Sequence, residues 1–336
     1  MNDNLYTIPE EISDVTMGRP HVVILGAGAS LAAFPNGDRN GRSLPLMNNF
    51  VEVIGLEPIL TRNKVRYLPG DNFEDLYSTI YDDPDRQHVA REIETVVEEY
   101  FSHLVLPDTP TIYDHLVLSL REKDVIATFN WDPFIYNACY RNHKVAKLPK
   151  IAYLHGSVAI GYCAEHRRKG VRGSPCSVCK RPFTPTRLLY PVANKDYNSD
   201  PFIRAEWSTL EGFLRGGFLL TIFGYGAPQS DVEAIRLMQT AWGKPEKREL
   251  EQIQIIDIKS EDELSANWAS FIHTHHYEVH NNFYDSWIAK HPRRTCEAAW
   301  QQFLEAKFVD ENPFPAKANF PDLHEWFKQL TDVENK

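Results

Sequence analysis

Long hydrophobic runs, a secretory leader pattern and low-complexity segments are all missing from this 336-residue sequence. No apolar stretch approaches the roughly 20 residues that a membrane-spanning helix needs. The first residues, MNDNLYTIPEEISD, lack the basic start and apolar run of a secretory signal. We therefore expect a cytoplasmic protein without a membrane partner.

Cysteine and positive charge are also scarce. The five cysteines are an odd number, and three of them cluster between residues 163 and 179, which is more typical of a metal site than of a disulfide framework. Lysine and arginine total 36 against 46 aspartates and glutamates, giving a net charge of −10. This balance argues against broad, non-specific nucleic-acid binding, although it is compatible with a local basic groove. No direct nucleic-acid partner is expected.

The apolar runs that are present are short and alternate with segments of helical periodicity. Those with β-rich character lie within residues 21–30, 124–130, 150–156, 216–226 and 253–259. Short apolar strands separated by helical segments predict an α/β fold, with a parallel sheet and crossover helices on both faces.

A long helical segment interrupts this alternation after the first strand, at residues 46–121. Within it, Phe73, Leu76, Tyr77 and Ile80 recur at the 3.6-residue spacing of one helix face. We expect a polar lead-in at 1–20, a main domain at 21–280 that includes this insertion, and a helical extension at 281–336.

Polar residues follow the apolar runs. The segments are GAGAS (26–30), TFNWD (128–132), LHGS (154–157) and FGYGAPQSD (223–231). Because ligands bind at the carboxyl ends of the strands in open parallel sheets, these residues are the candidates for chemistry. GAG after a strand is typical of a phosphate-binding turn, but Leu31 stands where the full dinucleotide pattern has a third glycine, so an ordinary strand-to-helix turn is the alternative.

Each of the other strand ends also has a purely structural interpretation. Asn130 could be a turn residue, and His155 could be a core histidine with satisfied hydrogen bonds. Ser230 or Asp231 could cap the helix that follows.

The clustered cysteines form a pattern of two chelating pairs. Two residues separate Cys163 from His166, and two separate Cys176 from Cys179. This spacing predicts a closed, tetrahedral Cys3His zinc site of structural character in a small module at 160–185. The alternative is a loop in which these residues meet by chance.

A second histidine-rich segment, FIHTHHYEVH, covers residues 271–280. It predicts an edge strand with exposed histidines, and a metal site is the less favoured interpretation.

The ordered set GAG-x-S, T-x-N-x-D, L-H-G-S and the Gly-Tyr turn before Ser-Asp resembles the sirtuin-like family of NAD-consuming enzymes, over residues 21–280. The segment NFEDLYSTI also resembles one common in the bacterial branch of that family. Sirtuins carry a zinc ribbon at the same point in the chain, a few residues after the catalytic histidine. The resemblance implies a Rossmann-like sheet and NAD+ as the substrate.

The resemblance also implies roles for individual residues. His155 would be the general base, Asn130 would orient the attacking group, and Asp132 would hold the nicotinamide amide or a ribose, or else brace its loop. The residues expected to bind NAD+ are Gly26, Ala27, Gly28 and Ser30 at the pyrophosphate, Gly224, Tyr225 and Asp231 at the ribose and phosphate floor, and Asp257 at the adenosine half.

The expected activity depends on which group accepts the ADP-ribose unit of NAD+. Deacylating sirtuins have G-I-P-D-F-R after the first turn, whereas this sequence has RSLPLM at 42–47, which keeps Leu44 and Pro45 but not the aspartate, phenylalanine or arginine. We also find no evident equivalent of the loop that pairs with an acyl-lysine peptide. Both departures favour water as the acceptor. The expected activity is therefore that of an NAD+ glycohydrolase (NADase), which releases nicotinamide and ADP-ribose.

Bacterial proteins of this appearance are typically effectors of antiphage defence that act by depleting NAD+. The resemblance therefore implies regulation by homo-oligomerisation or by a separate sensor, such as an ATPase or a nucleic-acid-guided protein. Two alternatives stay open: an NAD-dependent protein deacylase or ADP-ribosyltransferase, and a non-catalytic scaffold that binds NAD or ADP-ribose.

Overall fold

Six strands form one all-parallel sheet in the computed structural model, which describes residues 4–192, 197–226 and 231–335. From one edge to the other, the strands are β10 (Tyr277–His280), β9 (Gln252–Ile256), β8 (Leu219–Phe223), β2 (His21–Leu25), β3 (Val125–Thr128) and β4 (Lys150–Tyr153). Numbered by their order along the chain, they run 6-5-4-1-2-3, which is the Rossmann arrangement. The order reverses between β2 and β8, where such sheets bind ligands beyond the carboxyl ends of the strands.

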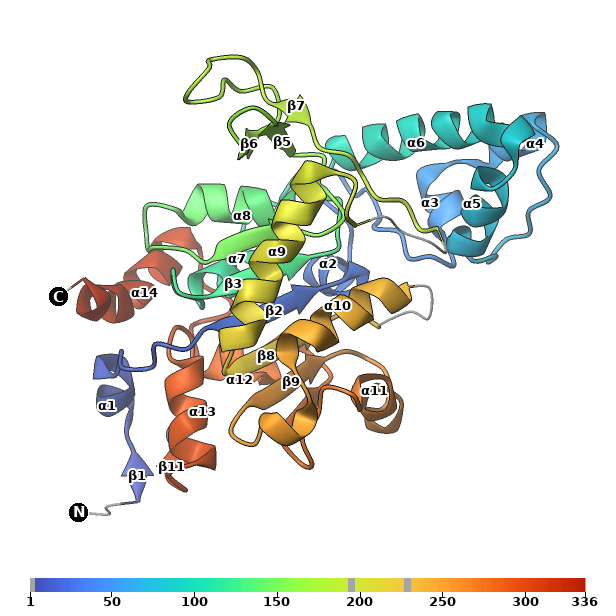
Figure 1. Cartoon of the computed structure of the whole chain (residues 1–336). Coiled ribbons are helices and arrows are strands. Elements are labelled where there is room, and N and C mark those ends of the chain that lie inside the picture. Colours follow the sequence, from blue (N-terminus) through green and yellow to red (C-terminus); the bar gives the residue numbers. More distant parts are fainter. Residues whose placement is uncertain (1–3, 193–196, 227–230, 336) are drawn as a thin grey trace.

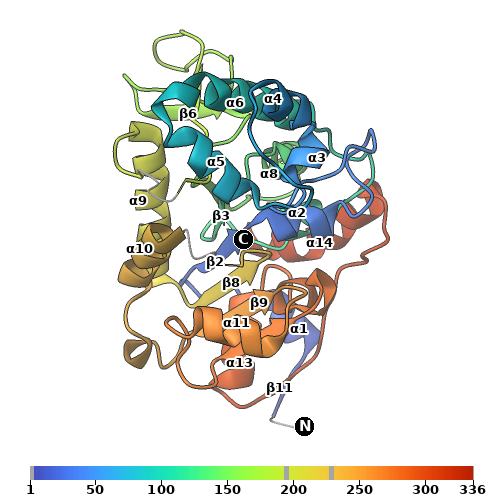
Figure 2. The ribbon, with the colours of Figure 1, turned by 90° about the vertical axis from the view of Figure 1, so that its right-hand side faces the viewer.

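Helices cover both faces of this sheet. On one face lie α9 (Pro201–Gly216) and α10 (Val232–Trp242), and on the other lie α2 (Ala27–Ala33) and α8 (Phe134–Asn142), with α7 (Ile112–Leu118) packed against both (Figure 2). Every residue of β2, β3, β8 and β9 is buried, as expected for strands covered on two sides. The predicted parallel sheet with flanking helices is confirmed.

The chain between β2 and β3 forms a group of helices that projects from the sheet (Figure 1). Its elements are α3 (Phe50–Ile54), α4 (Glu57–Arg62), α5 (Phe73–Tyr81), the 3-10 helix η1 (Pro84–Arg86) and α6 (Gln87–Ser102). The rings of Phe50 and Phe73 stack with their centroids 4.1 Å apart, and Phe73, Tyr77 and Ile80 of α5 are buried, as their spacing predicted.

A small antiparallel sheet of three strands follows β4 and lies at the top of Figure 1. Its strands are β6 (Arg168–Val171), β5 (Ile160–Cys163) and β7 (Thr184–Pro185), with β5 in the middle. The ring of Phe183 lies over Gly170, where an added Cβ would come within 2.3 Å of it. We refer to residues 160–185 as the Cys/His module.

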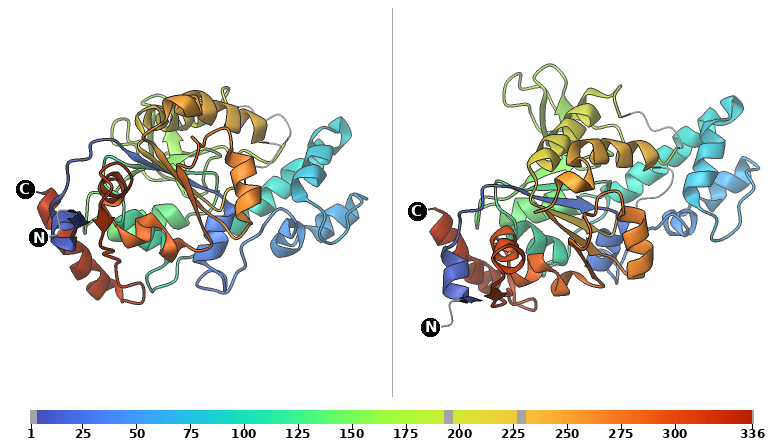
Figure 3. Two further views of the ribbon diagram at one scale, coloured as in Figure 1. Left: turned by 90° about the horizontal axis from the view of Figure 1, so that it is seen from below. Right: turned by 60° about the horizontal axis from the view of Figure 1, so that its bottom comes forward.

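The two ends of the chain lie together, on the side of the molecule opposite the insertion (Figure 3). Helix α1 (Ile8–Ser13) packs against α14 (Phe320–Glu334), and β1 (Leu5–Tyr6) pairs in parallel with β11 (Phe308–Val309). The remaining elements are η3 (Pro245–Lys247), α11 (Glu261–Trp268), η4 (Phe283–Asp285), α12 (Trp287–Lys290) and α13 (Thr295–Phe303).

The histidine-rich segment contributes the edge strand β10, but only residues Tyr277–His280 of it are extended. Among the described residues, no helix combines the length and the apolar character that a membrane crossing requires.

Candidate functional site

The turns that follow β2 and β8 cross in direct contact at the point where the strand order reverses. The N–H of Gly26 donates to the carbonyl of Phe223 (3.0 Å), and the N–H of Gly28 donates to that of Gly224 (2.9 Å). A Cβ on Gly224, whose φ is +60°, would lie 2.1 Å from the amide nitrogen of Ala29. The glycines are therefore needed for the contact between the two turns, whether or not a ligand binds there.

Helix α2 begins at Ala27, so the GAG segment forms its first turn. The N–H of Ala29 donates back to the carbonyl of Gly26 (3.0 Å). Ala27 is exposed, and within the described part of the chain its N–H has no acceptor. Of the residues expected at a pyrophosphate, Ala27 is thus the one whose N–H is available to an anion.

Ser30 faces inward, into a buried group of polar side chains. Its hydroxyl donates to Asp132 Oδ2 (2.7 Å), and it lies 2.7 Å from the hydroxyl of Tyr113 on α7. Asn130 Nδ2 donates to the carbonyl of Gly26 (2.8 Å) and to Ser30 Oγ (2.9 Å). We call Ser30, Tyr113, Asn130 and Asp132 the Asn130 network.

Asp132 is held by this network from within the protein. Besides the bond from Ser30, its Oδ1 accepts the N–H of Phe134 at the start of α8 (3.1 Å). Burial raises the pKa of the Asp132 carboxyl to about 6, although both hydrogen bonds act in the opposite direction. Of the two roles expected for Asp132, this geometry supports bracing of the loop.

His155 lies two residues beyond the end of β4 and is 7% exposed. Its Nε2 lies 3.0 Å from the hydroxyl of Tyr197, and its ring contacts that of Phe129 edge to face, with centroids 4.8 Å apart. Sequence reasoning missed Tyr197, because a tyrosine between polar residues in a long loop has no periodicity or spacing that connects it with a distant histidine.

The backbone around His155 is fixed by the chain that returns from the Cys/His module. The N–H of Leu189 donates to the carbonyl of His155 (3.0 Å), and Thr186 Oγ1 donates to the carbonyl of Ser157 (3.0 Å) while accepting its N–H (3.2 Å). Gly156 has φ +80°, and a Cβ there would lie 2.1 Å from the carbonyl oxygen of Arg187. Residues 186–189, which follow the module, therefore hold the backbone of the histidine turn.

Phe129 joins three of the strand ends. Its ring stacks on that of Tyr225 with centroids 4.2 Å apart and planes 7° apart, and it contacts His155 on another side. Because Asn130 is its neighbour in the chain, the asparagine, histidine and Gly-Tyr segments meet around this one ring. Tyr225 donates its hydroxyl to Asp231 Oδ2 (2.8 Å), and Asp231 is the N-cap residue of α10. Ser230 lies outside the described residues.

Asp257 follows β9 and is half-buried at the same edge of the sheet. Its N–H donates to the carbonyl of His280, and its Oδ1 accepts the N–H of Lys259 (3.1 Å). Asp257 thus lies beyond the carboxyl end of the strand next to β8. Its role at the adenosine half stays a prediction.

The Cys/His module brings its four candidate ligands together. One ligand atom from each of Cys163, His166, Cys176 and Cys179 lies within 4.8 Å of the others. Cys163 Sγ is 3.8 Å from Cys179 Sγ and 3.5 Å from His166 Nδ1. A tetrahedron with Zn–S bonds of about 2.3 Å and Zn–N bonds of about 2.0–2.1 Å has edges of about 3.8 and 3.6 Å. The cluster is therefore able to bind a metal ion such as zinc.

The thiol chemistry of Cys176 agrees with this. Backbone N–H groups of Cys179 and Val178 lower the pKa of the Cys176 thiol to about 7, which favours the thiolate that a metal requires. Among the described residues, the histidines of 271–280 do not gather into a second such group. The rings of His273 and His276 meet edge to face, 5.3 Å apart.

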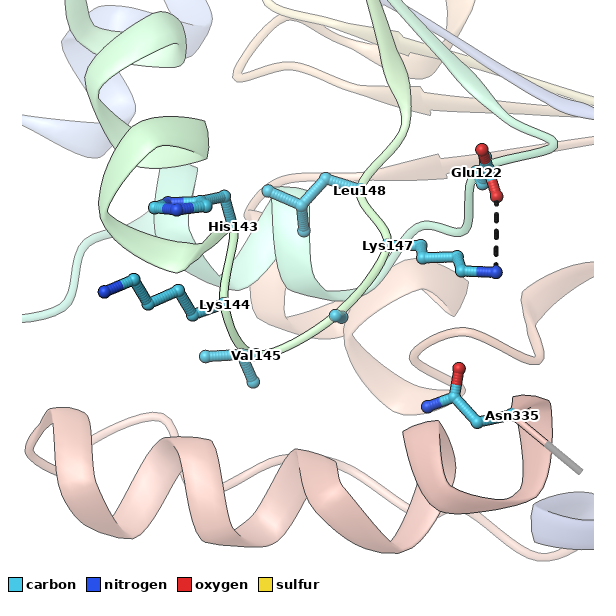
Figure 4. A pocket seen from close by; sticks show the side chains of 8 residues that line it. Glu122, His143, Lys144, Val145, Lys147, Leu148 and Asn335 are labelled. Atoms are coloured by element: carbon cyan, nitrogen blue, oxygen red, sulfur yellow. Dashed lines mark ion pairs between the residues drawn. The ribbon is translucent and has the colours of Figure 1, made fainter.

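A surface hollow elsewhere on the molecule is unrelated to these strand ends. Figure 4 shows it between residues 143–148, which precede β4, Glu122, which precedes β3, and Asn335. Its ion pair, between Lys147 Nζ and Glu122 Oε2 at 3.9 Å, joins two side chains that are each about 70% exposed. The hollow therefore lies at the amino-terminal edge of the sheet.

No protein-family model matches the chain, and no curated relative matches it in sequence. Among solved structures, it is similar to a Sir2 homologue in complex with NAD, with 13% identity over 81% of this chain and 87% of that chain and a TM-score of 0.39. It is also similar to a structure from a study of sirtuin substrate affinity, with 15% identity, coverage of 79% and 89%, and a TM-score of 0.39. A third is Sir2 with an inhibitor, 2′-O-acetyl-ADP-ribose and a deacetylated peptide, with 13% identity, coverage of 86% and 94%, and a TM-score of 0.36.

Proposed function

We propose that this protein is an NAD+ glycohydrolase, which cleaves the bond between nicotinamide and ribose and releases nicotinamide and ADP-ribose. The observation that carries the proposal is the meeting of the Asn130, His155 and Tyr225 segments around Phe129, beside the crossing of the β2 and β8 turns. This is the place in a Rossmann-arranged sheet where a dinucleotide binds.

The chemistry requires a base and an oriented water molecule. The water oxygen attacks the anomeric carbon of the nicotinamide ribose, the C–N bond breaks, and its electron pair leaves with neutral nicotinamide. The proton of the water passes to the His155 imidazole, which acts as the general base. We propose that Asn130 orients the water, since its side chain is half-buried and already fixed on one side.

The remaining residues would hold the dinucleotide. The diphosphate would lie along the turn of Gly26, Ala27 and Gly28, where the exposed N–H of Ala27 offers a donor. Ser30 and Asp132 would act from the protein interior, by holding the side chain of Asn130 in place. The residues proposed at the riboses and the adenosine half are Gly224, Tyr225, Asp231 and Asp257.

Water as the acceptor is supported by the segment that departs from the deacylase pattern. Residues 42–47 are attached to the insertion: Tyr100 donates to the carbonyl of Ser43 (2.6 Å), and the N–H of Phe73 donates to that of Met47 (2.7 Å). Leu44 is buried in the same place. The segment is thus held by hydrogen bonds from α5 and α6 of the insertion.

We further propose that the cluster of Cys163, His166, Cys176 and Cys179 holds a structural Zn²⁺, because its ligands leave no open coordination position. An enzyme that destroys NAD+ must be restrained in its own cell. We therefore propose a regulated effector of bacterial antiphage defence, controlled by self-assembly or by a sensor partner.

The test is to incubate the purified protein with NAD+, alone and with candidate partners, and to measure nicotinamide and ADP-ribose by chromatography. We expect turnover that His155→Ala and Asn130→Ala abolish. The exposed His143, in the surface hollow, provides the control: His143→Ala should retain activity. Turnover that persists in His155→Ala would refute the mechanism.

The same assay separates the alternatives. A deacylase would consume NAD+ only with an acyl-lysine peptide and would form acyl-ADP-ribose, and a transferase would modify a protein. A scaffold would bind NAD+ or ADP-ribose without forming any product.

A further inference from the structure

Tyr113 contributes a buried hydroxyl to the Asn130 network, and no motif in the sequence points to it. It lies on α7, is 1% exposed, and its ring packs edge to face on Phe34, with centroids 5.7 Å apart. Its hydroxyl is 2.7 Å from Ser30 Oγ and 3.3 Å from Asn130 Nδ2. Burial raises the pKa of this phenol well above its ordinary value, so the hydroxyl keeps its proton and is able to donate it.

The hydrogen atoms of the network can be assigned from chemistry alone. The carbonyl of Gly26 only accepts, so the amide of Asn130 must turn its nitrogen toward it. The single proton of Ser30 goes to the Asp132 carboxylate, which leaves Ser30 Oγ as an acceptor. Ser30 Oγ then receives one hydrogen from Asn130 and one from Tyr113.

This assignment fixes which atom of Asn130 faces outward. Both amide hydrogens are used on the buried side, and among the described residues no donor reaches Asn130 Oδ1. The half-buried side chain therefore presents an acceptor toward the site. An acceptor can hold one hydrogen of a water molecule and leave a lone pair of its oxygen free to attack carbon.

We propose that Tyr113 is a positioning residue, which locks the Asn130 amide with its oxygen toward the nucleophile of the proposed NAD+ hydrolysis. Tyr113 acts through Ser30 and Asn130 and touches neither substrate nor reacting atoms. Without its hydroxyl, Ser30 loses the donor that keeps its own proton on Asp132, and Asn130 Nδ2 loses its third contact, to the phenol oxygen at 3.3 Å. The asparagine then samples other rotamers, and the oriented water is held less often.

The test compares Tyr113→Phe with Tyr6→Phe. Both changes remove a buried hydroxyl and keep the ring, but Tyr6 lies on β1 at the opposite end of the molecule and donates to Asp14 (3.0 Å). Protein labelled with ¹⁵N at asparagine gives one side-chain NH₂ pair for Asn130, identified by its loss in Asn130→Ser. We expect hydrogen exchange of this pair to become about tenfold faster in Tyr113→Phe, the equivalent of one lost hydrogen bond, and to stay unchanged in Tyr6→Phe.

NAD+ kinetics provide the second measurement. We expect kcat to fall about tenfold in Tyr113→Phe, with KM within about twofold of wild type, because only the orientation of the nucleophile changes. An equal loss of kcat in Tyr6→Phe would assign the effect to general destabilisation and overturn the proposal.

The exchange measurement needs no substrate, so the two proposals fail separately. Wild-type protein without NAD+ turnover would refute the proposed function, while the exchange of the Asn130 pair still decides the role of Tyr113. Unchanged exchange in folded Tyr113→Phe would refute the positioning role. If Tyr113→Phe does not fold, Ser30→Ala removes the shared acceptor, and it must show the same faster exchange for the proposal to stand.

Discussion

At the scale of single residues, the carboxyl of Asp132 is buried without a basic partner among the described residues. It is 4% exposed, and burial raises its pKa to about 6 from an ordinary value near 4. Within the described part of the chain, its hydrogen-bond donors are the hydroxyl of Ser30 and the N–H of Phe134. A carboxyl of this kind binds its proton more tightly in the folded than in the unfolded chain.

This property predicts a pH dependence of stability. The contribution of protonated Asp132 to the free energy of unfolding is full below about pH 4. It is lost as the pH rises toward 6, because ionising the buried group then costs free energy. We expect the free energy of unfolding of Asp132→Asn, relative to wild type, to rise by about 2–3 kcal/mol between pH 4 and pH 7. Urea titrations at several pH values measure it. The exposed Asp75→Asn serves as control and should follow wild type; a constant offset for Asp132→Asn would contradict the prediction.

At the scale of elements, the turn after β4 depends on the segment that leaves the Cys/His module. Gly156 lies against the backbone of Arg187, and Thr186 and Leu189 bond to the residues on either side of it. The histidine and the module, though separate motifs in the sequence, are therefore one structural unit.

Alanine substitutions at two glycines of nearly equal φ isolate this contact. Gly156 has φ +80° and Gly55 has φ +81°, but an added Cβ on Gly55 meets no atom within 4 Å. We expect Gly55→Ala to destabilise the protein by about 1–2 kcal/mol through backbone strain alone. Gly156→Ala should lower the free energy of unfolding by about 3 kcal/mol more than Gly55→Ala does, because the carbonyl of Arg187 must move. Urea unfolding of both variants tests this, and equal losses would show that the close approach to Arg187 is absent.

Metal content provides the second prediction at this scale. We expect about one zinc ion per chain by elemental analysis, and loss of the metal together with a lower melting temperature in Cys176→Ser or after treatment with a strong chelator. Cys139 lies on α8, outside the module, so Cys139→Ser should keep its metal. Purified wild-type protein that holds no metal and melts identically with and without chelator would rule out a structural ion.

At the scale of the whole molecule, buried charges tie the C-terminal helix to the amino-terminal side of the sheet. Glu334 of α14 pairs with Arg293 and Arg294, whose side chains are 1% and 0% exposed. Arg293 also donates to the carbonyl of Leu118, and Arg294 to that of Ile12. Burial alone would raise the pKa of Glu334, but the hydrogen bond and charge of Arg293, with those of Arg294, lower it overall.

Removal of this carboxylate should destabilise the molecule without touching the site. We expect Glu334→Gln to lower the free energy of unfolding by about 3–5 kcal/mol at pH 7, because two buried guanidinium groups are left without their counter-charge. A glutamate with a lowered folded-state pKa stabilises above its unfolded value, and this contribution is lost as the pH falls through the lowered pKa. The difference between Glu334→Gln and wild type should therefore shrink in acid. Urea unfolding measures both effects, and the exposed Glu325→Gln on the same helix is the control.

Much of the fold was predictable because it depends on local pattern. Buried strands such as β2 and β8 read as short apolar runs, and α5 shows one apolar face at helical spacing. The edge strand β10 was harder: the histidine-rich segment covers ten residues, but only the last four, Tyr277–His280, pair with β9. Pairing depends on how far the neighbouring strand extends, which the segment itself does not encode.

The candidate site, like the fold, was predictable from the sequence only in part. The sequence alone determined that polar residues follow the strands and that the cysteines and histidine have chelating spacing, since both follow from positions along the chain. Only the tertiary structure decided that Ser30 turns inward to Asp132, that Tyr113 and Tyr197 reach Asn130 and His155, and that Gly156 lies against Arg187. These contacts join residues many positions apart. Their geometry is set by how helices and loops pack across the sheet, and no periodicity in the sequence records that packing.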